Sequence, residues 1–127
     1  MAKKIIYTSD APAPIGPYSQ AVQAGSMLYT SGQIAIDPAT NEYHPASIEE
    51  EATMVMKNLE ALLKAAGCTF EDVVKTSIFL KDMSDFGAVN SIYATYFKDQ
   101  FPARETVEVA CLPKNCKVEI AMIAMVP

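Results

Sequence analysis

Residues 118–126 read Val-Glu-Ile-Ala-Met-Ile-Ala-Met-Val, and this stretch decides the fold. Apolar residues fill both sets of alternating positions, so we expect a strand over 117–126 that is buried on both of its faces. Glu119 is the only charged residue from Val118 onward. An isolated carboxylate in an apolar strand is costly, and burial raises its pKa toward values that suit proton transfer near neutral pH. The alternative is that Glu119 lies near the surface at the start of the strand, beside Lys117.

The elements predicted upstream of this strand follow the order strand, two strands, helix, strand, helix, strand. Ser47 opens the first helix, with the Glu three residues on as its capping-box partner, and Gly67 ends it. Ser84 caps the second helix, and Pro102 marks its end. Strand–helix–strand units make parallel neighbours and hairpins make antiparallel ones. We therefore expect one α+β domain over 1–127, a mixed sheet with both helices on one face. The strands predicted before the last one cover 4–8, 20–24, 27–36, 73–81 and 104–111.

The second face of this sheet has no predicted cover within the chain. Two helices of this length cover only one face, whereas the strand over 117–126 is apolar on both. A strand of that kind requires burial on both sides. We therefore expect a homo-oligomer in which the uncovered face packs against another subunit.

The charge balance excludes several kinds of partner. The chain of 127 residues has a formal net charge of −5, and its lysines are scattered among acids, so nucleic acid is not expected as a partner. No segment approaches the roughly 20 apolar residues that cross a membrane, and no secretion signal is visible. These features predict a cytoplasmic protein with no membrane partner. Three cysteines, an odd number with no C-x-x-C spacing, agree with reduced thiols in that compartment.

Neither a metal site nor a cofactor is expected. The single histidine, His44, lies in a polar turn, and one histidine with scattered cysteines cannot assemble a usual zinc set. The same turn offers His44 no oriented partner, which argues against a cysteine–histidine hydrolase. The sequence also lacks a glycine-rich phosphate-binding loop, so no nucleotide cofactor is implied.

Arg104 is the second charged candidate for a functional site. It follows Phe-Pro-Ala and begins a predicted strand. Its planar fork suits a substrate carboxylate held by two hydrogen bonds. The competing interpretation, favoured by pattern alone, is a surface arginine paired with Glu105 or Glu108.

Smaller signals accompany the two charges. Gly32 follows Ser31 inside a predicted strand, where glycine marks either a close approach of backbone or ligand, or a bulge. Tyr18 ends a proline-rich loop and is either an ordinary packing residue or part of a pocket. Asn90 occupies an exposed helix position or a subunit contact.

Several motifs occur together over nearly the whole chain, in a fixed order and spacing. As a set they resemble the Rid family of reactive intermediate deaminases, close to its RidA branch. The motifs are Ile-Gly-Pro-Tyr-Ser-Gln-Ala at 15–21, Thr-Ser-Gly-Gln-Ile at 30–34, Val-Lys-Thr-Ser-Ile-Phe-Leu at 74–80, Asp-Phe-Gly-Ala-Val-Asn at 85–90, Pro-Ala-Arg at 102–104, Leu-Pro-Lys at 112–114 and Val-Glu-Ile at 118–120.

The resemblance implies a chorismate-mutase-like fold and a homotrimer whose sheets form a central barrel, with sites in clefts between subunits. It implies hydrolysis of 2-imino or 2-enamino acids, such as 2-iminopropanoate and 2-iminobutanoate, to 2-keto acids and ammonia without a cofactor. By the family pattern Arg104 binds the substrate carboxylate, and Glu119 positions or activates water. The remaining family positions are occupied by Tyr18 near the imine, by the backbone around Gly32 and Thr106, and by Ser31 and Asn90 lining the cleft.

Two features depart from the nearest members of the family. Thr106 stands where several deaminases carry cysteine, although many relatives have threonine there. Glu105 directly follows Arg104, but strand neighbours point to opposite faces, so Glu105 need not neutralise it.

Two other functions compete with the deaminase. One is a non-enzymatic trimer that binds ligands or acts like a chaperone; it would need the arginine but not the carboxylate. The other is an endoribonuclease or translation inhibitor, which the acidic balance disfavours.

Overall fold

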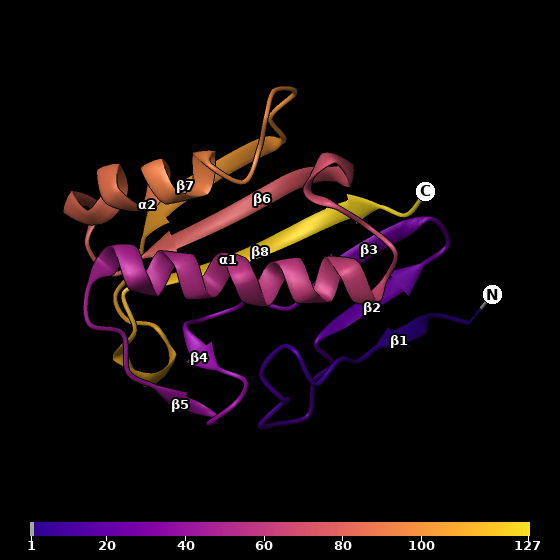
Figure 1. Ribbon diagram of the computed structural model, residues 1–127, viewed down its shortest axis with the longest axis horizontal. Coiled ribbons are helices and arrows are strands. Elements are labelled where there is room, and N and C mark those ends of the chain that lie inside the picture. Colours follow the sequence, from indigo (N-terminus) through magenta and orange to yellow (C-terminus); the bar gives the residue numbers. More distant parts are fainter. Residues whose placement is uncertain (1) are drawn as a thin grey trace.

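Strand β8 (Val118–Met125) lies inside a six-stranded sheet, between β3 (Met27–Thr30) and β6 (Val73–Leu80). The computed structural model describes residues 2–127. The sheet continues from β3 to β2 (Ala21–Ala24) and β1 (Lys4–Ile6), and from β6 to β7 (Ala103–Glu108). β6 and β7 are parallel and all other neighbours are antiparallel, which confirms the predicted mixed sheet (Figure 1).

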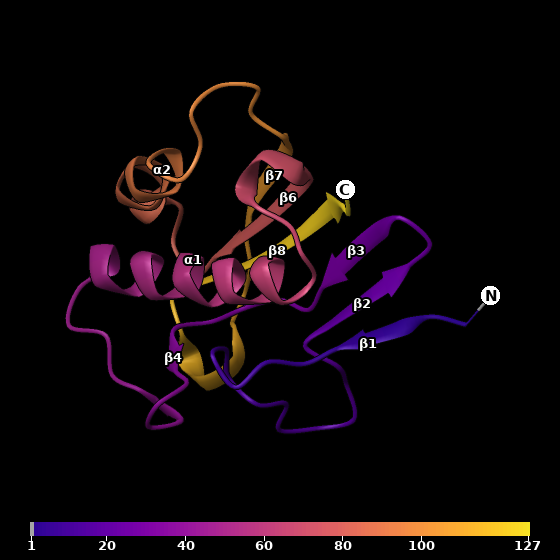
Figure 2. The ribbon, with the colours of Figure 1, turned by 45° about the vertical axis from the view of Figure 1, so that its right-hand side comes forward.

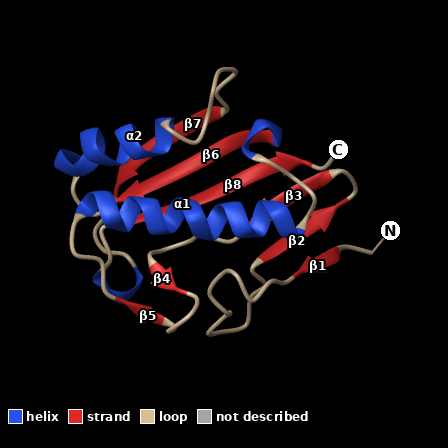
Figure 3. Ribbon diagram, in the orientation of Figure 1, coloured by secondary structure: helices blue, strands red, loops and turns tan. Residues whose placement is uncertain are grey.

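Helices α1 (Ile48–Ala65) and α2 (Phe86–Ala94) lie across the same face of the sheet, as predicted (Figures 1 and 2). A small hairpin of β4 (Ile36–Asp37) and β5 (Glu42–Tyr43) lies beside the sheet, near the start of α1 (Figure 3). Three short 3-10 turns complete the chain: η1 (Phe70–Asp72), η2 (Met83–Asp85) and η3 (Pro113–Asn115).

The alternation of β8 separates the two faces of the sheet. Val118, Ile120, Met122 and Ala124 are at most 1% exposed and belong to the core under the helices. The residues between them point to the other face. Glu119 belongs to this second set.

Ser47 caps α1 and Gly67 follows its end, as predicted, but the predicted capping box does not close. The Ser47 hydroxyl accepts a 3.0 Å hydrogen bond from the Glu50 N–H, whereas the Glu50 carboxylate bonds the Ala46 N–H at 3.4 Å and not that of Ser47. The helix stops where Gly67 adopts a φ of 79°, a left-handed conformation that costs glycine little. The Cys68 N–H then closes the last turn on a carbonyl of the helix.

The predicted strand over 27–36 is wrong in its second half. β3 ends at Thr30, and only an isolated bridge between Gln33 and Ile120 continues the pairing with β8. At this point the side chain of Glu119 lies against the backbone of Gly32. The strand predicted over 104–111 is likewise shorter, since β7 ends at Glu108.

The prediction that Ser84 caps the second helix is also wrong. Ser84 lies within η2, where its N–H donates to the Asp82 carboxylate at 2.9 Å, and the side chain of Asp85 forms no cap. The helix ends at Ala94, well before Pro102, because the chain turns as the Thr95 hydroxyl bonds back to a carbonyl of the last turn.

The face of the sheet opposite the helices carries apolar side chains that nothing in residues 2–127 covers. Ile5, Tyr29, Val107 and Met125 point to this face and are between 43% and 53% exposed. This agrees with the unfilled second face predicted from the sequence. Within the same residues, no helix combines the length and apolar character needed to cross a membrane.

Candidate active site

Glu119 points into a cavity of about 420 Å³ on the side of the sheet away from the helices. Tyr18, Ser31 and Gly32 line the same cavity, so four of the predicted site residues meet here. The other walls are mainly apolar, with Ile15, Ile34, Ile36 and Pro113 among them. Burial raises the pKa of the Glu119 carboxyl above its ordinary value. The cavity therefore presents one proton-handling group in a largely apolar surround.

Gly32 is needed because the Glu119 side chain lies directly against its backbone. A Cβ at position 32 would be 2.7 Å from Cδ of Glu119 and closer still to Oε2. The backbone of Gly32 has no positive φ, so the requirement is for space alone. The close approach predicted from a glycine in a strand is thus made by the Glu119 side chain.

The remaining wall of this cavity is held by hydrogen bonds to the proline-rich loop. The Ser31 hydroxyl donates to the Ser19 carbonyl at 2.6 Å. The buried Gln20 amide donates to the carbonyls of Thr8 and Pro12, both at 2.9 Å. Tyr18 stays half exposed, with its ring free to meet a ligand.

Arg104 lies on the edge strand β7, in a different hollow. Its guanidinium donates a 2.7 Å hydrogen bond to the Asn90 side-chain oxygen. The same group lies over the rings of Phe86 and Tyr93, 5.4 and 5.1 Å from their centroids. Two stacked rings and one amide leave the outer nitrogens of the fork available to an anion. Arg104 and Asn90 line a hollow of about 420 Å³, together with Phe101 and Pro102.

Neither acidic neighbour in the sequence neutralises Arg104. Glu105 points to the opposite face, where it bonds the Ser77 hydroxyl and lies 3.1 Å from the Lys75 ammonium group. The Ser77 hydrogen bond, aided by Lys75, lowers the pKa of Glu105. Glu108 accepts a hydrogen bond from the Met83 N–H at 2.8 Å. Arg104 is exposed, as a surface arginine would be, but its predicted pairing with either acid is wrong.

Within one chain, the sheet separates Arg104 from Glu119. Arg104 is in register with Thr76 of β6, whose hydroxyl accepts a 3.1 Å bond from Tyr93 on α2, so Arg104 is on the helix side. Glu119 is in register with Phe79, an odd number of residues further along β6, and points to the other side. The chain thus presents two separate open hollows, which we name the clamp half (Arg104 and Asn90) and the carboxylate half (Glu119, Tyr18, Ser31 and Gly32).

The sequence profile described as Endoribonuclease L-PSP matches residues 8–126. A solved Yersinia pestis protein of the conserved Rid family is 49% identical, with a TM-score of 0.96 over 98% of this chain and 100% of that one. The chain belongs to the Rid family. The resemblance inferred from the motifs is confirmed, and so is the α+β fold.

Two further proteins similar to this chain are described by an activity or by a bound ligand. A mouse protein named 2-iminobutanoate/2-iminopropanoate deaminase is 52% identical over 123 residues, covering 97% of this chain and 91% of its own length. The structure of E. coli TdcF with bound serine is 42% identical, with a TM-score of 0.92 over 96% of this chain and 98% of that one.

Thr106, the last of the predicted site residues, shares the helix-side face with Arg104 and lies two residues beyond it on β7. Its hydroxyl oxygen is buried, and no hydrogen-bond partner for it exists among residues 2–127. A hydroxyl left in this state beside the clamp half of a Rid-family site has capacity to bond a group from outside the chain.

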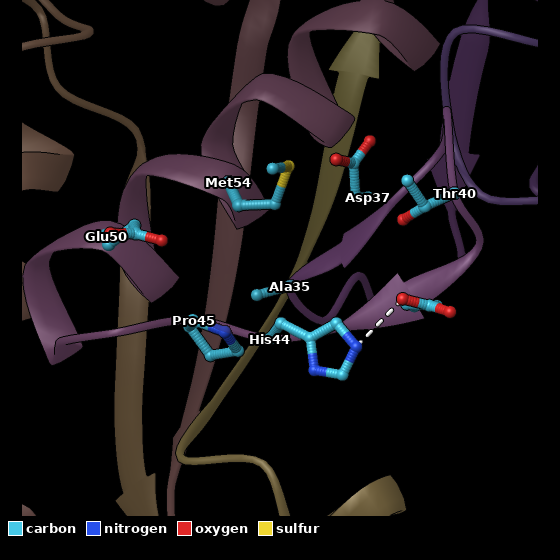
Figure 4. Close-up of a pocket in the computed structure, with 8 residues that line it drawn as sticks. Ala35, Asp37, Thr40, His44, Pro45, Glu50 and Met54 are labelled. Atoms are coloured by element: carbon cyan, nitrogen blue, oxygen red, sulfur yellow. Dashed lines mark hydrogen bonds and ion pairs between the residues drawn. The ribbon is translucent and has the colours of Figure 1, made fainter.

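His44 lines neither of the two hollows described above. Its imidazole Nε2 is 2.8 Å from the Glu42 carboxylate, beside a separate cavity of about 210 Å³ (Figure 4). The expectation that His44 has no partner is therefore wrong, because the β4–β5 hairpin places Glu42 next to it. No cysteine lines this cavity, and the described part of the chain contains no cluster of three potential metal ligands.

The stacking partners of Arg104 were not predicted as site residues. Their residue types indicate ordinary core packing, and indeed Tyr93 is buried and Phe86 packs against the core. Their spacing with Asn90, at intervals of four and three, places all three on one helix face. This spacing, with an amide side chain between two aromatic rings, could have predicted a helix face that binds a cation.

Proposed function

We propose that this chain hydrolyses small 2-imino and 2-enamino acids, such as 2-iminopropanoate and 2-iminobutanoate, to 2-keto acids and ammonia. The observation that carries the proposal is the pair of complementary half-sites. One offers an arginine fork for a carboxylate, and the other offers a carboxyl group with a raised pKa in an apolar cavity. A substrate whose carboxylate is next to its reacting carbon requires both groups, close together.

The half-sites meet, in this proposal, between the subunits of a homotrimer. The exposed apolar face of the sheet supports a subunit contact of that kind, because such a face is rarely left open to water. Arg104 and Asn90 of one subunit then complete the cavity of Glu119, Tyr18, Ser31 and Gly32 of its neighbour. The backbone near Thr106 contributes to the clamp side.

The reaction proceeds by addition of water to the C=N bond. Arg104 holds the carboxylate with the part of its fork not used by Asn90. Ionised Glu119 takes one proton from water as the oxygen bonds to the imine carbon and delivers it to the nitrogen, which gives a carbinolamine. Glu119 then takes the proton of the new hydroxyl group and passes it to the nitrogen as the C–N bond breaks, so that ammonia leaves, the keto group forms and Glu119 is ionised again. In this proposal the hydroxyl of Tyr18, which lines the same cavity, bonds the imine nitrogen.

So small a site suffices because imines already hydrolyse in water. The protein has to supply orientation, one anion clamp and one proton-handling group, and no cofactor enters these steps. Two relatives support this assignment: the mouse protein through its deaminase name, and E. coli TdcF through its bound serine, itself a small carboxylate with nitrogen on the adjacent carbon. A cytoplasmic location fits a role next to enzymes that release such imines.

The competing functions are less well supported. A pure binding protein has no use for a half-buried Glu119 whose pKa is raised at a cost to stability. The endoribonuclease in the family description requires an RNA-binding surface, which a net charge of −5 disfavours.

An imine-trapping assay tests the proposal. A threonine dehydratase generates 2-iminobutanoate, and semicarbazide traps whatever imine the Rid-family protein has not hydrolysed. We expect the wild-type protein to lower the amount of trapped product. With Arg104→Ala or Glu119→Gln, the amount should equal that found without the protein. Lys98→Ala, which removes an exposed cation away from both half-sites, is the matched control and should behave as wild type. Equal trapping with and without the wild-type protein would refute the deaminase assignment.

A further inference from the structure

A buried carboxylate on α1 holds the backbone immediately before Glu119. Glu51 is 1% exposed, whereas Glu49 and Glu50 beside it are exposed. Its Oε2 accepts hydrogen bonds from the N–H groups of Lys117 at 2.7 Å and Val118 at 3.3 Å. Hydrogen bonds of this kind, from backbone to a charged acceptor, are among the stronger ones in proteins.

Glu51 forms no ion pair with any of residues 2–127. Its titratable neighbours are the Tyr43 phenol and the Cys116 thiol: burial, then Glu51, raises the pKa of Tyr43, and burial, followed by Glu51 and Glu119, raises that of Cys116 to about 12. Oε2 of Glu51 thus accepts from two backbone N–H groups, while the Tyr43 phenol and the Cys116 thiol lie close enough for the Glu51 charge to raise their pKa values.

The start of β8 needs such a tie because it has no continuous strand on one side. β3 pairs only with residues 123–125 of β8, and the chain after it contributes a single bridge at Ile120. The turn before β8 is irregular, with Lys114 and Asn115 both at positive φ. Glu51 therefore supplies acceptors that a neighbouring strand would otherwise provide.

The same face of α1 also holds the opposite wall of the cavity. Asn58, seven residues after Glu51, is likewise 1% exposed. Its amide donates to the carbonyls of Ile34 at 3.1 Å and Ile36 at 2.9 Å, and both residues line the Glu119 cavity. One rigid helix thus fixes two backbone segments on either side of the reacting carboxyl group.

We propose that Glu51 is a positioning residue for the reaction. By holding the Lys117–Val118 backbone, it keeps the Glu119 carboxyl against Gly32 at the depth in the cavity where water adds to the imine. Arg104 is bound by α2 and does not depend on this tie. The inference rests on the proposed deaminase function. It implies that loss of Glu51 lowers turnover and leaves carboxylate binding unchanged.

The test compares Glu51→Ala, Glu51→Gln and the core variant Leu63→Ala, which destabilises α1 at its far end. Turnover is measured by imine trapping, and carboxylate binding by calorimetry with the product 2-oxobutanoate. We expect Glu51→Ala to lose about 10- to 100-fold in turnover, the range expected for a misplaced catalytic group. Product binding should change by less than about twofold, since the clamp is intact. Glu51→Gln keeps an acceptor oxygen and should retain most of the rate. Leu63→Ala should melt at a lower temperature yet keep the wild-type rate.

Wild-type turnover in folded Glu51→Ala would overturn the proposal, as would a parallel loss of product binding or an equal loss in Leu63→Ala. If Glu51→Ala does not fold, Glu51→Asp replaces it, because the shorter side chain keeps the charge but withdraws the oxygen from the Lys117 N–H. In that variant we expect reduced turnover together with faster amide exchange at Lys117 and Val118. Unchanged exchange would refute the tie, whether or not the wild-type protein proves to be a deaminase.

Discussion

Arg104 and Glu119 leave the same sheet from opposite faces, so no single subunit brings their side chains together. If the site is shared between subunits, two inactive variants should restore each other. Arg104→Ala and Glu119→Gln, coexpressed in equal amounts, place an intact arginine opposite an intact carboxyl in about a quarter of the clefts of a trimer. We therefore expect about a quarter of the wild-type deaminase activity from the mixture, measured by imine trapping.

Coexpression of Arg104→Ala with the double variant Arg104→Ala/Glu119→Gln is the control, because it cannot form an intact cleft. If mixed trimers of Arg104→Ala and Glu119→Gln form but show no deaminase activity, the site is not shared between subunits. A monomer in sizing experiments would contradict it as well.

Replacing Gly32 by alanine should remove activity while leaving the fold intact. The new Cβ would be 2.7 Å from Glu119 Cδ, so the carboxyl group must leave its place against the backbone. We expect turnover to fall by about 100-fold, as for other displaced catalytic groups, with a circular dichroism spectrum like that of wild type. Gly87→Ala is the matched control: no atom lies within 4 Å of a Cβ there, and the helix gains up to about 1 kcal/mol. A normal rate in Gly32→Ala would show that the Glu119 position is not critical.

Pattern alone predicted the sheet, both helices and the open apolar face, because these depend on periodicity and caps that are local in sequence. The end of β3 was not predictable in this way. Residues 31–35 look like a strand, and neither the end of β3 at Thr30 nor the approach of Glu119 to Gly32 can be read from local pattern, because both depend on the tertiary structure.

The site was predicted in a similar, partial manner. Motifs named the chemistry-bearing residues, but not that Arg104 and Glu119 point away from each other, since this depends on the register between β6 and its two neighbours. Glu51 gave no signal at all: it reads as one of three acids in the first turn of α1, and only the tertiary structure buries it.

Removing the amide that orients Arg104 should weaken substrate binding more than turnover. Asn90→Ala takes away the 2.7 Å hydrogen bond to the guanidinium and leaves the stacking of Phe86 and Tyr93 in place. Loss of a hydrogen bond to a charged group corresponds to roughly a tenfold rise in KM, with kcat within about twofold of wild type. Ser91→Ala, next on the helix but bonded only to the Gly87 carbonyl, is the control. A drop in kcat with unchanged KM would place Asn90 at the reacting atoms instead.

The raised pKa of Glu119 predicts how stability depends on pH. Because burial raises this pKa above its ordinary value of 4.5, the folded protein holds a proton that the unfolded chain has released. Wild-type stability should therefore fall as the pH rises from about 4.5 to the folded-state pKa, and level off above it. Glu119→Gln lacks this loss and should be more stable than wild type at neutral pH, with the difference vanishing below the ordinary carboxyl value of 4.5. Thermal unfolding at fixed protein concentration measures the difference.

Glu105→Gln should show the opposite sign, which makes it a matched control for the pH argument. The hydrogen bond from Ser77, with help from Lys75, lowers the pKa of Glu105, so its contribution to stability is present above the unfolded value of 4.5 and is lost as the pH falls through the folded value. Glu105→Gln should thus be less stable than wild type at neutral pH and equal to it in acid.

Deaminase activity should rise with pH over the window in which Glu119 ionises, since the reaction uses the carboxylate form. Two results would show that Glu119 is not the proton-accepting group of the site. One is a rate that rises with pH at or below 4.5, the ordinary pKa of a glutamate carboxyl group. The other is a stability gain in Glu119→Gln that is the same at every pH.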